Sequence, residues 1–528
     1  MSAPHILILG AGVMQLPALQ IAKREGWTTA VVDGNPEAVG RNLADTFGHV
    51  DLRDREGLVA WAQAYRDRRR LDGVFTAGTD FSTSVAYVAE RLGLPGIPFE
   101  TALDASDKER MRRRFAEAGV PSPPFFAVRA EETPLLVAAR AREIGFPVVV
   151  KPVDNMGARG VVRIDDADGL PAAVEEALRY SGDGRVLVER FIEGPEFSID
   201  AVVRHGEVVI CGVADRDIRF PPWFIEIGHT MPTERDPALR RDLERVFSLG
   251  VRALGITNGA AKGDIFLGPQ GPVVGEIAAR LSGGYMSGWT YPYSSGIEPT
   301  RAAMRIALGL PPGELAPLRA HVSAERALLS VPGIVREVEG FDRARAIPGV
   351  KDVFERVAAG DHVVFPRNNV EKCGNVIASA VTRAGALQAA LQAIRAVEIR
   401  LQPAVHETER FLWGNAVPGR SESGGGGEPR TEGAFYPALE AMPIDLCEVA
   451  SWKSVEGHTD YCGRTLGETM SVLQQCEEFA VVADLPPDSP GRVRFRIAVS
   501  RGGLQGGRFF LDTIREDPTA RERVCFAE

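Results

Sequence analysis

The stretch KGDIFLGPQGPVVGEIAARLSGG, residues 262–284, carries the pattern on which the fold prediction rests. Asp264 and Glu276 each lie in an apolar run, about a dozen residues apart, which predicts two neighbouring antiparallel strands. Because carboxylates buried without a metal or a partner are costly, the pair predicts a site for one or two Mg²⁺ ions bridging nucleotide phosphates. Arg280, just past Glu276, can stabilise charge that develops on an acyl-phosphate.

Two lysines precede this stretch. Lys108 follows Asp107 at a predicted helix start, and Lys151 ends the apolar strand VVVKP. Ammonium groups at these two positions can bind the α- and β-phosphates of a nucleotide. Taken alone, each lysine also suits a solvated surface, but the apolar run before Lys151 favours a buried role.

A glycine-containing loop, VDNMGARGV, spans Val153–Val161 between two predicted strands. Gly157 and Gly160 allow backbone N–H groups to approach an anion, and Arg159 adds a positive charge. The loop therefore predicts a phosphate-binding segment. An ordinary hairpin loop is the alternative.

The segment VLVERFIEGPEFSID, residues 186–200, suits a purine-binding site. Glu189 can accept a hydrogen bond from an exocyclic amine, and the backbone around Arg190 and Ile192 can bind the ring edge. Glu196, seven residues after Glu189, can bond the ribose hydroxyls. The alternative is a strand, turn and strand with solvated glutamates.

The first hundred residues alternate short apolar runs with amphipathic stretches, which predicts a doubly wound α/β domain with parallel strands. Leu94–Pro98 is expected as its last strand. Gly10-Ala11-Gly12 follows the first strand as phosphate-binding glycines do, but Gln15 occupies the slot of the third glycine. We favour a tight strand-to-helix turn over a nicotinamide site.

The chain divides into five predicted parts: an α/β domain at 1–104, a core at 105–320 with subdomains 105–184 and 185–320, a small α/β domain at 321–410, a linker at 411–432 containing SESGGGG, and an α+β accessory domain at 433–528. In this last part, Glu478–Ala483 and Val493–Val499 look like strands. Four cysteines also lie there, and we expect them to be unpaired and buried rather than a zinc site with His458, because no Cys-x-x-Cys pair exists (Cys447, Cys462, Cys476 and Cys525).

Composition narrows the function classes. The net charge of −10 and the pI of about 5.5 disfavour a nucleic-acid partner. No apolar run approaches the roughly 20 residues that span a bilayer, and the amino terminus lacks the basic region of a signal peptide. We therefore expect a cytoplasmic protein with small-molecule partners, compatible with a homodimer.

Taken in order, these segments resemble the ATP-grasp superfamily, which includes biotin carboxylase, carbamoyl-phosphate synthase large chain and D-alanine–D-alanine ligase. The resemblance covers about residues 3–405. It implies ATP as cofactor, with one or two Mg²⁺ ions. It also implies that Lys108 and Lys151 contact the phosphates and that the loop Gly157–Val161 closes over them. Asp264 and Glu276 would bind the metal, with Arg280 near the transferred phosphate. Glu196 would contact the ribose, and the adenine hinge would consist of Glu189, Arg190, Phe191 and Ile192.

One position departs from the family pattern Glu-x-Asn-x-Arg. The slot of the Asn, a third metal ligand, is Ala278, which puts a second Mg²⁺ in doubt. The version EIAARLSGG resembles that of amino-acid ligases, which implies a carboxylate–amine ligase that forms an acyl-phosphate and releases ADP. A biotin carboxylase-type enzyme that activates bicarbonate and a non-catalytic ATP-binding module are the alternatives.

Two further segments are candidates for substrate contact. Asp80 lies in GTDFSTS, Gly78–Ser84, at the carboxyl edge of the first predicted sheet, where such folds bind ligands. We favour a helix-capping role for Asp80 over substrate contact. His229 lies in IEIGHTMPT, Ile225–Thr233, which resembles a loop that faces the active site in these ligases, and a solvated histidine is an equal alternative.

Overall fold

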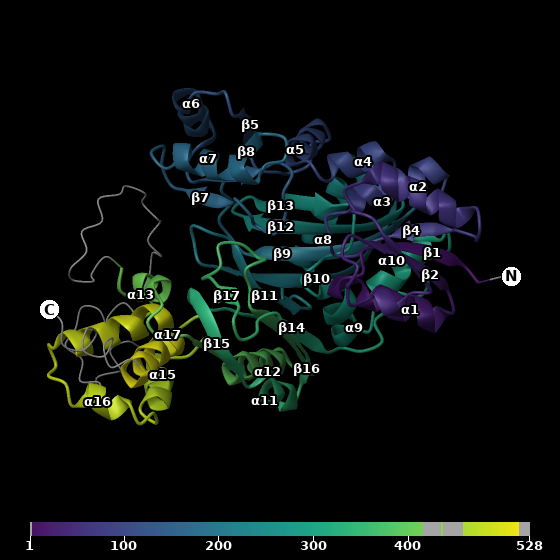
Figure 1. Ribbon diagram of the computed structural model, residues 1–528. Helices are drawn as coiled ribbons and strands as arrows, with labels where there is room; N and C mark the ends of the chain where they lie inside the picture. Colours follow the sequence, from purple (N-terminus) through teal and green to yellow (C-terminus); the bar gives the residue numbers. More distant parts are fainter. Residues whose placement is uncertain (1–2, 415–434, 437–457, 517–528) are drawn as a thin grey trace. The chain divides into compact units, whose positions relative to one another are not determined.

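The computed structural model describes residues 3–414, 435–436 and 458–516 (Figure 1). The chain forms two compact units, one of Met1–Glu325 with Ser379–Ala386 and one of Arg326–Ala378 with Leu387–Glu528. Most of the predicted linker at 411–432 lies outside the described residues, and so do Cys447 and Cys525 of the predicted accessory domain. Among the helices that are described, none is long and apolar enough to cross a membrane.

The first unit begins with a parallel sheet of order β3-β2-β1-β4, as the sequence predicts. The expected strand at Leu94–Pro98 is wrong, because this segment is an irregular connection whose two prolines lack the N–H groups that a ladder needs. The elements are β1 His5–Leu9, η1 Val13–Gln15, α1 Leu16–Glu25, β2 Thr28–Asp33, η2 Arg41–Leu43, β3 Thr46–His49, α2 Arg55–Arg66, β4 Gly73–Phe75, α3 Ser82–Leu92 and α4 Phe99–Asp104.

The glycine turn after β1 is closed by its own neighbours. Gly10 has a φ of 100°, and the N–H of Ala11 donates to Asp33 Oδ2 at 2.6 Å. The side-chain amide of Gln15 exchanges two hydrogen bonds with the backbone of Ala77, at 2.7 and 3.1 Å. The Gln15 side chain is thus held against the turn, with its Cγ 3.3 Å from where a Cβ on Gly10 would lie, which supports the tight-turn interpretation.

A four-stranded antiparallel sheet of order β5-β8-β6-β7 follows. Its core is formed by apolar residues of the strands and of the two helices α6 and α7. The predicted strand–loop–strand arrangement around residues 153–161 is confirmed by the pairing of β6 with β7. The elements are α5 Lys108–Glu117, β5 Phe125–Arg129, α6 Pro134–Ile144, β6 Val148–Pro152, β7 Val162–Ile164, α7 Leu170–Tyr180 and β8 Arg185–Arg190.

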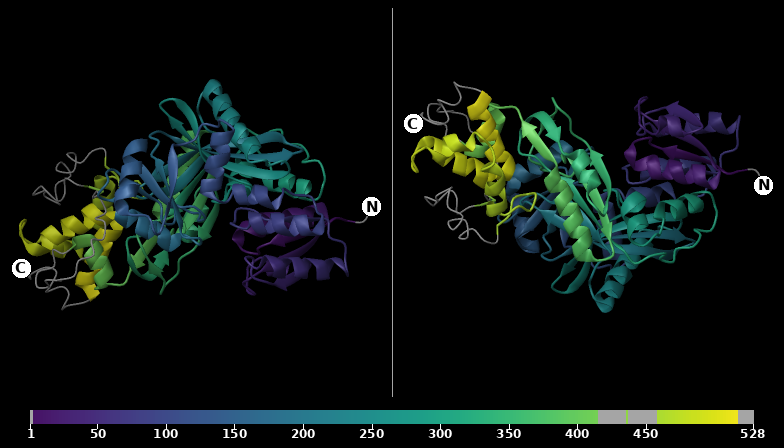
Figure 2. Two further views of the ribbon diagram at one scale, coloured as in Figure 1. Left: turned by 90° about the horizontal axis from the view of Figure 1, so that it is seen from above. Right: turned by 90° about the horizontal axis from the view of Figure 1, so that it is seen from below.

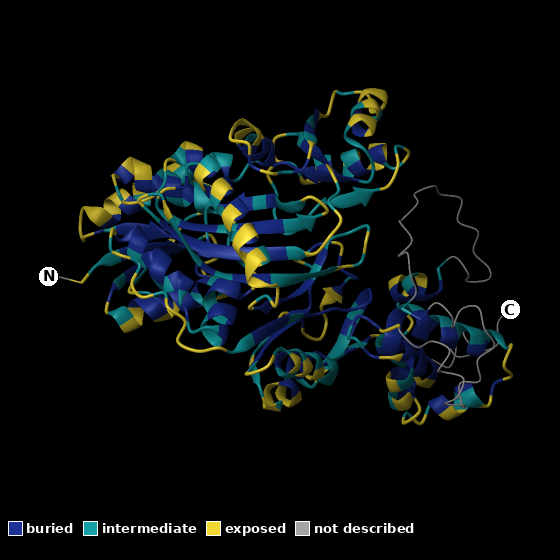
Figure 3. Ribbon diagram, turned by 180° about the vertical axis from the view of Figure 1, so that it is seen from behind, coloured by how far each residue is buried: buried dark blue, intermediate teal, exposed yellow. Residues whose placement is uncertain are grey.

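The central antiparallel strands run in the order β13-β12-β9-β10-β11 (Figures 1 and 2). The helix α8 packs on β10, β12 and β13 with its apolar stripe, and its outer face is exposed (Figure 3). The helix α10 packs on β9 and β12 and also contacts α1 and β4. The elements are β9 Glu196–Arg204, β10 Glu207–Arg219, β11 Ile225–Met231, α8 Pro237–Ala253, β12 Gly259–Gly268, β13 Gly271–Ala278, η3 Met286–Thr290, α9 Tyr291–Ser294 and α10 Pro299–Ala307.

In the second unit, β16 pairs antiparallel with β18, and β15 pairs with β17 and β19. The two predicted strands at Glu478–Ala483 and Val493–Val499 are wrong, because the helices α16 and α17 cover these runs. Apart from one isolated bridge, the regular elements described in residues 458–516 are helices joined by turns. The elements from residue 322 on, of which β14, β18 and α12 lie partly in the first unit, are β14 Val322–Leu328, β15 Gly333–Glu339, α11 Phe341–Ala346, β16 Val350–Glu355, β17 His362–Val363, β18 Gly374–Ala380, α12 Arg383–Ala396, β19 Glu398–Leu401, α13 His406–Trp413, α15 Leu466–Leu473, α16 Phe479–Ala483 and α17 Pro490–Glu516.

Candidate active site

The two predicted metal carboxylates meet across an antiparallel ladder. Asp264 of β12 is the direct partner of Glu276 of β13, with a register shift immediately after Asp264. Directly opposite residues of such a pair present their side chains on the same face of the sheet. The predicted antiparallel strands are therefore confirmed, while metal binding by the pair stays a prediction.

Glu276 is a carboxylate surrounded by cations. Burial raises its pKa, but Lys108, Lys262, Lys151 and Arg280 outweigh burial and lower the pKa to about 2. Of these four cations, Lys108 forms an ion pair with it, and its Nζ lies 3.8 Å from Glu276 Oε1. Glu276 is therefore ionised at neutral pH, within a cluster that carries an excess of positive charge.

Asp264 belongs to a network that the sequence did not reveal. Arg216, on β10, lies 3.1 Å from Asp264 Oδ1 and donates to Glu196 at 3.0 Å and to Glu226 at 2.7 Å. Burial lowers the pKa of this guanidinium, and the three carboxylates outweigh burial and raise it. Asp264 also pairs with Lys262. The only sequence signal of Arg216 is its charge within a strand.

The donor set of the carboxylate pair fits Mg²⁺. Mg²⁺ is commonly held by one or two carboxylates, with substrate phosphates and water completing the octahedron. The described parts of the chain contain no cluster of three or more His, Cys, Asp and Glu side chains arranged for a metal. Asp264 and Glu276 would therefore be the protein ligands, in line with the doubt that Ala278 raises about a second ion.

The two phosphate-binding candidates Lys108 and Lys151 lie in one buried region. Lys108 Nζ donates to the Asn155 carbonyl, in the glycine loop, at 2.6 Å. Lys151 pairs with Glu189. Burial lowers the pKa of Lys151 despite this partner, and the nearby charge of Lys108 lowers it further. The fold thus brings together two lysines that are 43 residues apart, as predicted.

Glu189 has both carboxylate oxygens engaged by cations. Its Oε1 accepts from Lys151 and its Oε2 accepts from Arg112 at 2.9 Å. Burial raises the pKa of Glu189, but Arg112 and Lys151 outweigh it and lower the pKa. Arg112 was missed by the sequence reasoning. It is fully buried and also donates to the Gly275 carbonyl at 2.5 Å, next to Glu276.

After Glu189, the backbone has one N–H group that makes no hydrogen bond to a described residue and could contact a purine. The N–H groups of Arg190 and Phe191 donate to the carbonyls of Pro124 and Pro147, each at 2.9 Å. The Ile192 N–H makes no hydrogen bond to any described residue. Glu196, at the start of β9, has its pKa raised by burial although Arg216 opposes this effect. Binding of adenine at Ile192 and of ribose at Glu196 stays a prediction.

The glycine loop has the backbone conformation that glycine favours. The φ angles of Gly157, Ala158 and Gly160 are 70°, 61° and 68°. A Cβ atom on Gly160 would lie 2.8 Å from the Tyr180 ring. Arg159 extends from this loop to Asp80, at 3.3 Å, in a partly exposed ion pair of the kind that contributes little stability. The pair can therefore open at small cost.

The structure contradicts the capping role that we favoured for Asp80 and the solvated position that we considered for His229. The N-cap of α3 is Phe81, without a side-chain cap, so the capping role expected for Asp80 is wrong. A solvated His229 is also wrong, since this side chain is buried on β11 between Glu226 at 3.2 Å and Glu325 at 3.3 Å. Burial lowers the pKa of His229, but the two glutamates raise it to about 8.

Arg280 is the cation of the site that lacks a carboxylate partner. Its Nη1 donates to the Leu281 carbonyl at 2.9 Å, and its Nη2 lies 3.7 Å from the Met156 sulfur. Within the described residues it makes no ion pair, and its buried Nε has no hydrogen-bond partner. A fixed guanidinium with spare donors beside Glu276 is suited to bind an anionic ligand.

Two of the tail cysteines are described, and both belong to the second compact unit. Cys462 and Cys476 are free and partly buried, and burial raises the pKa of both thiols. The Arg508 guanidinium lies beside the Cys476 sulfur, at 2.6 Å.

Two family models match the chain. The model of the ATP-grasp domain matches residues 144–288, and the model of the L-amino acid ligase C-terminal domain 2 matches residues 326–402. The first match contains the glycine loop, Glu189, Asp264, Glu276 and Arg280. It ends at residue 288, just after the segment on which the fold prediction rests.

Known proteins resemble the chain over similar ranges. The uncharacterized protein y4rH of Sinorhizobium fredii is 28% identical over 69% of this chain and 75% of that protein. Carnosine synthase 1 of Mus musculus is 26% identical over 64% of this chain but only 43% of its own length. The crystal structure of L-amino acid ligase from Bacillus licheniformis superposes with a TM-score of 0.66 at 22% identity, covering 76% of this chain and all of that chain.

Proposed function

We propose that the chain is an ATP-dependent carboxylate–amine ligase whose acid substrate is an amino acid or a related small acid, because residues 144–288 match the ATP-grasp domain and residues 326–402 match the L-amino acid ligase C-terminal domain 2. The observation that carries the proposal is the meeting of charged side chains from distant segments: Asp264 and Glu276 are ladder partners, and Lys108 Nζ lies 3.8 Å from Glu276 Oε1. Arg280, four residues after Glu276, makes no ion pair within the described residues. An excess of fixed positive charge in a partly buried site favours a polyanion such as ATP.

The reaction divides into two displacements. A carboxylate oxygen of the acid attacks the γ-phosphorus, the bond from that phosphorus to the β-bridging oxygen breaks, and ADP leaves. The amine nitrogen then attacks the acyl carbon, phosphate leaves, and the nitrogen loses a proton. Catalysis of this kind depends on positioning and on charge stabilisation, and needs no nucleophilic side chain.

The side chains have separate parts in this proposal. Lys108 and Lys151 bind phosphate oxygens, and the loop Val153–Val161 covers them. Arg280 holds the acid and stabilises the charge that develops on it. Mg²⁺, held by Asp264 and Glu276, would supply further neutralisation of the phosphates.

The matched families favour an amino-acid substrate over bicarbonate. The carboxyl-terminal family model is named for L-amino acid ligases, and carnosine synthase is among the curated relatives. The alternative of a degenerate module fits poorly with the ionised Glu276 and with the two buried lysines beside it.

The test is a screen of ADP release over paired acids and amines, with the full chain and Mg-ATP. We expect release to require both an acid and an amine, and to be lost in Glu276→Gln. Release with bicarbonate alone would instead favour a carboxylase. Binding of Mg-ATP without turnover for any pair would contradict the proposal.

A further inference from the structure

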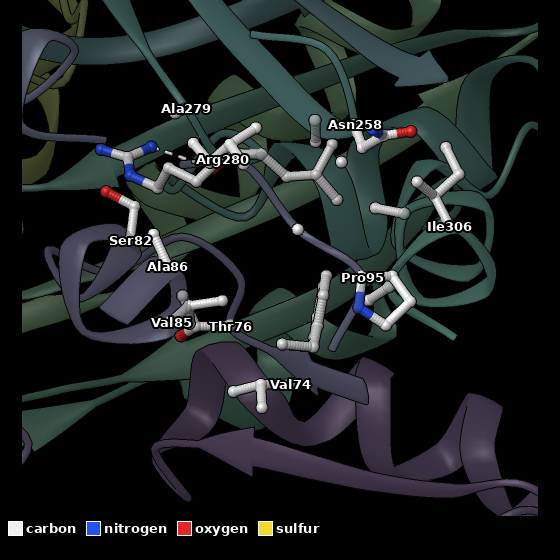
Figure 4. Close-up of a pocket in the computed structure, with 18 residues that line it drawn as sticks. Val74, Thr76, Ser82, Val85, Ala86, Pro95, Asn258, Ala279, Arg280 and Ile306 are labelled. Atoms are coloured by element: carbon white, nitrogen blue, oxygen red, sulfur yellow. Dashed lines mark hydrogen bonds between the residues drawn. The ribbon is translucent and has the colours of Figure 1, made fainter. Parts of the chain in front are cut away.

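An apolar cavity of about 70 Å³ lies between β4, α3 and α10, next to Arg280 (Figure 4). Its walls are mostly apolar side chains from segments distant in the sequence, with Ser82 and Asn258 on opposite sides and Thr76 beside Val85 (Figure 4). The wall includes Val74, Ala86, Pro95, Ile97, Ala303 and Ile306. An apolar cavity of this size is well above the 10–15 Å³ or so that one water needs, and it offers water few hydrogen-bond partners.

Arg280 connects the cavity to the phosphate site. Its aliphatic stem runs along the cavity, and its guanidinium lies at the end marked by Ser82, away from Asn258 (Figure 4). The same guanidinium reaches the glycine loop, where its Nη2 lies 3.7 Å from the Met156 sulfur, and Arg280 follows Glu276 by four residues. A ligand held by Arg280 would therefore have one end near the phosphates and the other in the cavity.

The positive charge of Arg280 favours an anionic ligand at this end of the cavity. A guanidinium stays ionised in proteins, and within the described residues this one has no carboxylate partner and a buried Nε without a hydrogen bond. The cavity walls supply no charge of either sign apart from Arg280. The part of the ligand that enters the cavity is therefore apolar, and the part that Arg280 holds is a carboxylate.

We propose that this cavity binds the aliphatic side chain of the acid substrate while Arg280 holds its carboxylate. The inference rests on the proposed function and names its substrate class, an amino acid with a short aliphatic side chain, whose α-ammonium group stays outside the cavity beside the carboxylate. Each methylene buried in the cavity should raise kcat/KM about fourfold. A polar or charged side chain would lose its hydration without gaining partners.

The experiment measures ADP release for a series of acids: glycine, alanine, 2-aminobutyrate, valine and leucine, each with the amine found in the screen. For the wild-type chain we expect kcat/KM to rise from glycine towards valine and leucine. Ile306→Ala enlarges the cavity and should move the optimum to longer side chains. Ala303→Val narrows it and should lower kcat/KM for leucine at least tenfold while glycine changes less than about twofold.

Leu249→Ala is the matched control, because it truncates an aliphatic side chain that is 38% exposed on α8. It should leave the order of the acids unchanged. The KM for ATP, measured for every variant, reports whether the fold is intact. If acids promote ADP release but their order is the same in both cavity variants, the cavity inference is overturned and the ligase proposal stands. If no acid promotes release, the proposed function itself fails.

Discussion

Asp264 and Glu276 are paired residues in the antiparallel ladder of β12 and β13. Their opposition explains how two carboxylates separated by a turn come to lie on one face of the central strands. Three of the four surrounding cations come from other segments, Lys108 from α5, Lys151 from β6 and Arg280 from the segment that follows β13, while Lys262 lies on β12 itself. The site is therefore a pair of carboxylates on neighbouring strands with cations from several elements around it.

Replacement of Glu276 by glutamine removes the negative charge of a candidate metal ligand and keeps the shape of the side chain. We expect kcat for ATP turnover to fall at least about 100-fold, because the phosphates lose part of their charge stabilisation. The measurement is ADP release at saturating Mg-ATP. Asp242→Asn, an exposed carboxylate on α8, is the control and should retain full activity. Comparable activity of the Glu276 variant would contradict the assignment.

Arg112 should be a structural support of the phosphate site. In Arg112→Met, Glu189 keeps only Lys151 as a partner in a buried environment, and we expect a loss of about 3 kcal/mol in the free energy of unfolding. Adding Glu189→Gln to that variant removes the uncompensated charge and should restore part of the loss. Urea unfolding of the single and double variants measures both effects. No recovery in the double variant would count against this pairing.

The pKa of His229 makes the stability of the fold depend on pH. Glu226 and Glu325 outweigh burial and raise this pKa to about 8, above the unfolded value of 6.5. The contribution is therefore full below about pH 6.5 and is lost as pH rises through about 8, and it amounts to about 2 kcal/mol. His229→Gln should remove that part of the difference between pH 6 and pH 9, as measured by denaturant unfolding. An unchanged pH profile in the variant would exclude a charged His229.

Gly160→Ala tests the glycine loop. Gly160 has a φ of 68°, and an added Cβ would lie 2.8 Å from the Tyr180 ring. A backbone cost of about 1–2 kcal/mol should displace the loop and raise the KM for ATP about 5- to 30-fold. Gly119→Ala is the control, since its φ is 66° and a Cβ there meets no neighbour within 4 Å. Equal effects on the KM for ATP in both variants would contradict a role of the glycine loop in ATP binding.

The sequence was informative where partners are local or follow a regular period. The strands of the carboxylate pair, the parallel sheet of the amino-terminal segment and the strands around the glycine loop follow from short apolar runs. The tail was harder, because short runs of β-branched residues fit a strand or a buried helix. In α17 the buried residues Phe495, Ala498 and Val499 are spaced as on one face of a helix, but so short a run does not by itself distinguish a helix from a strand.

The partners of the site residues could not be predicted. Arg112 contacts Glu189 from 77 positions away and Gly275 from 163 positions away. His229 contacts Glu325 from 96 positions away. Such pairs have no sequence spacing of their own, because the fold alone brings the chain segments together. For the same reason the sequence left Asp80 as a helix cap and did not identify the cavity beside Arg280.

The transfer of oxygen from the acid to phosphate tests the central claim most directly. A mixture of amino acids labelled with ¹⁸O in the carboxyl group is incubated with Mg-ATP, the amine and the full chain, and the released phosphate is analysed by mass spectrometry. An acyl-phosphate route predicts one ¹⁸O atom in each phosphate released, with ADP as the nucleotide product. Unlabelled phosphate, or label in AMP, would contradict the proposed activation of a carboxylate by γ-phosphoryl transfer.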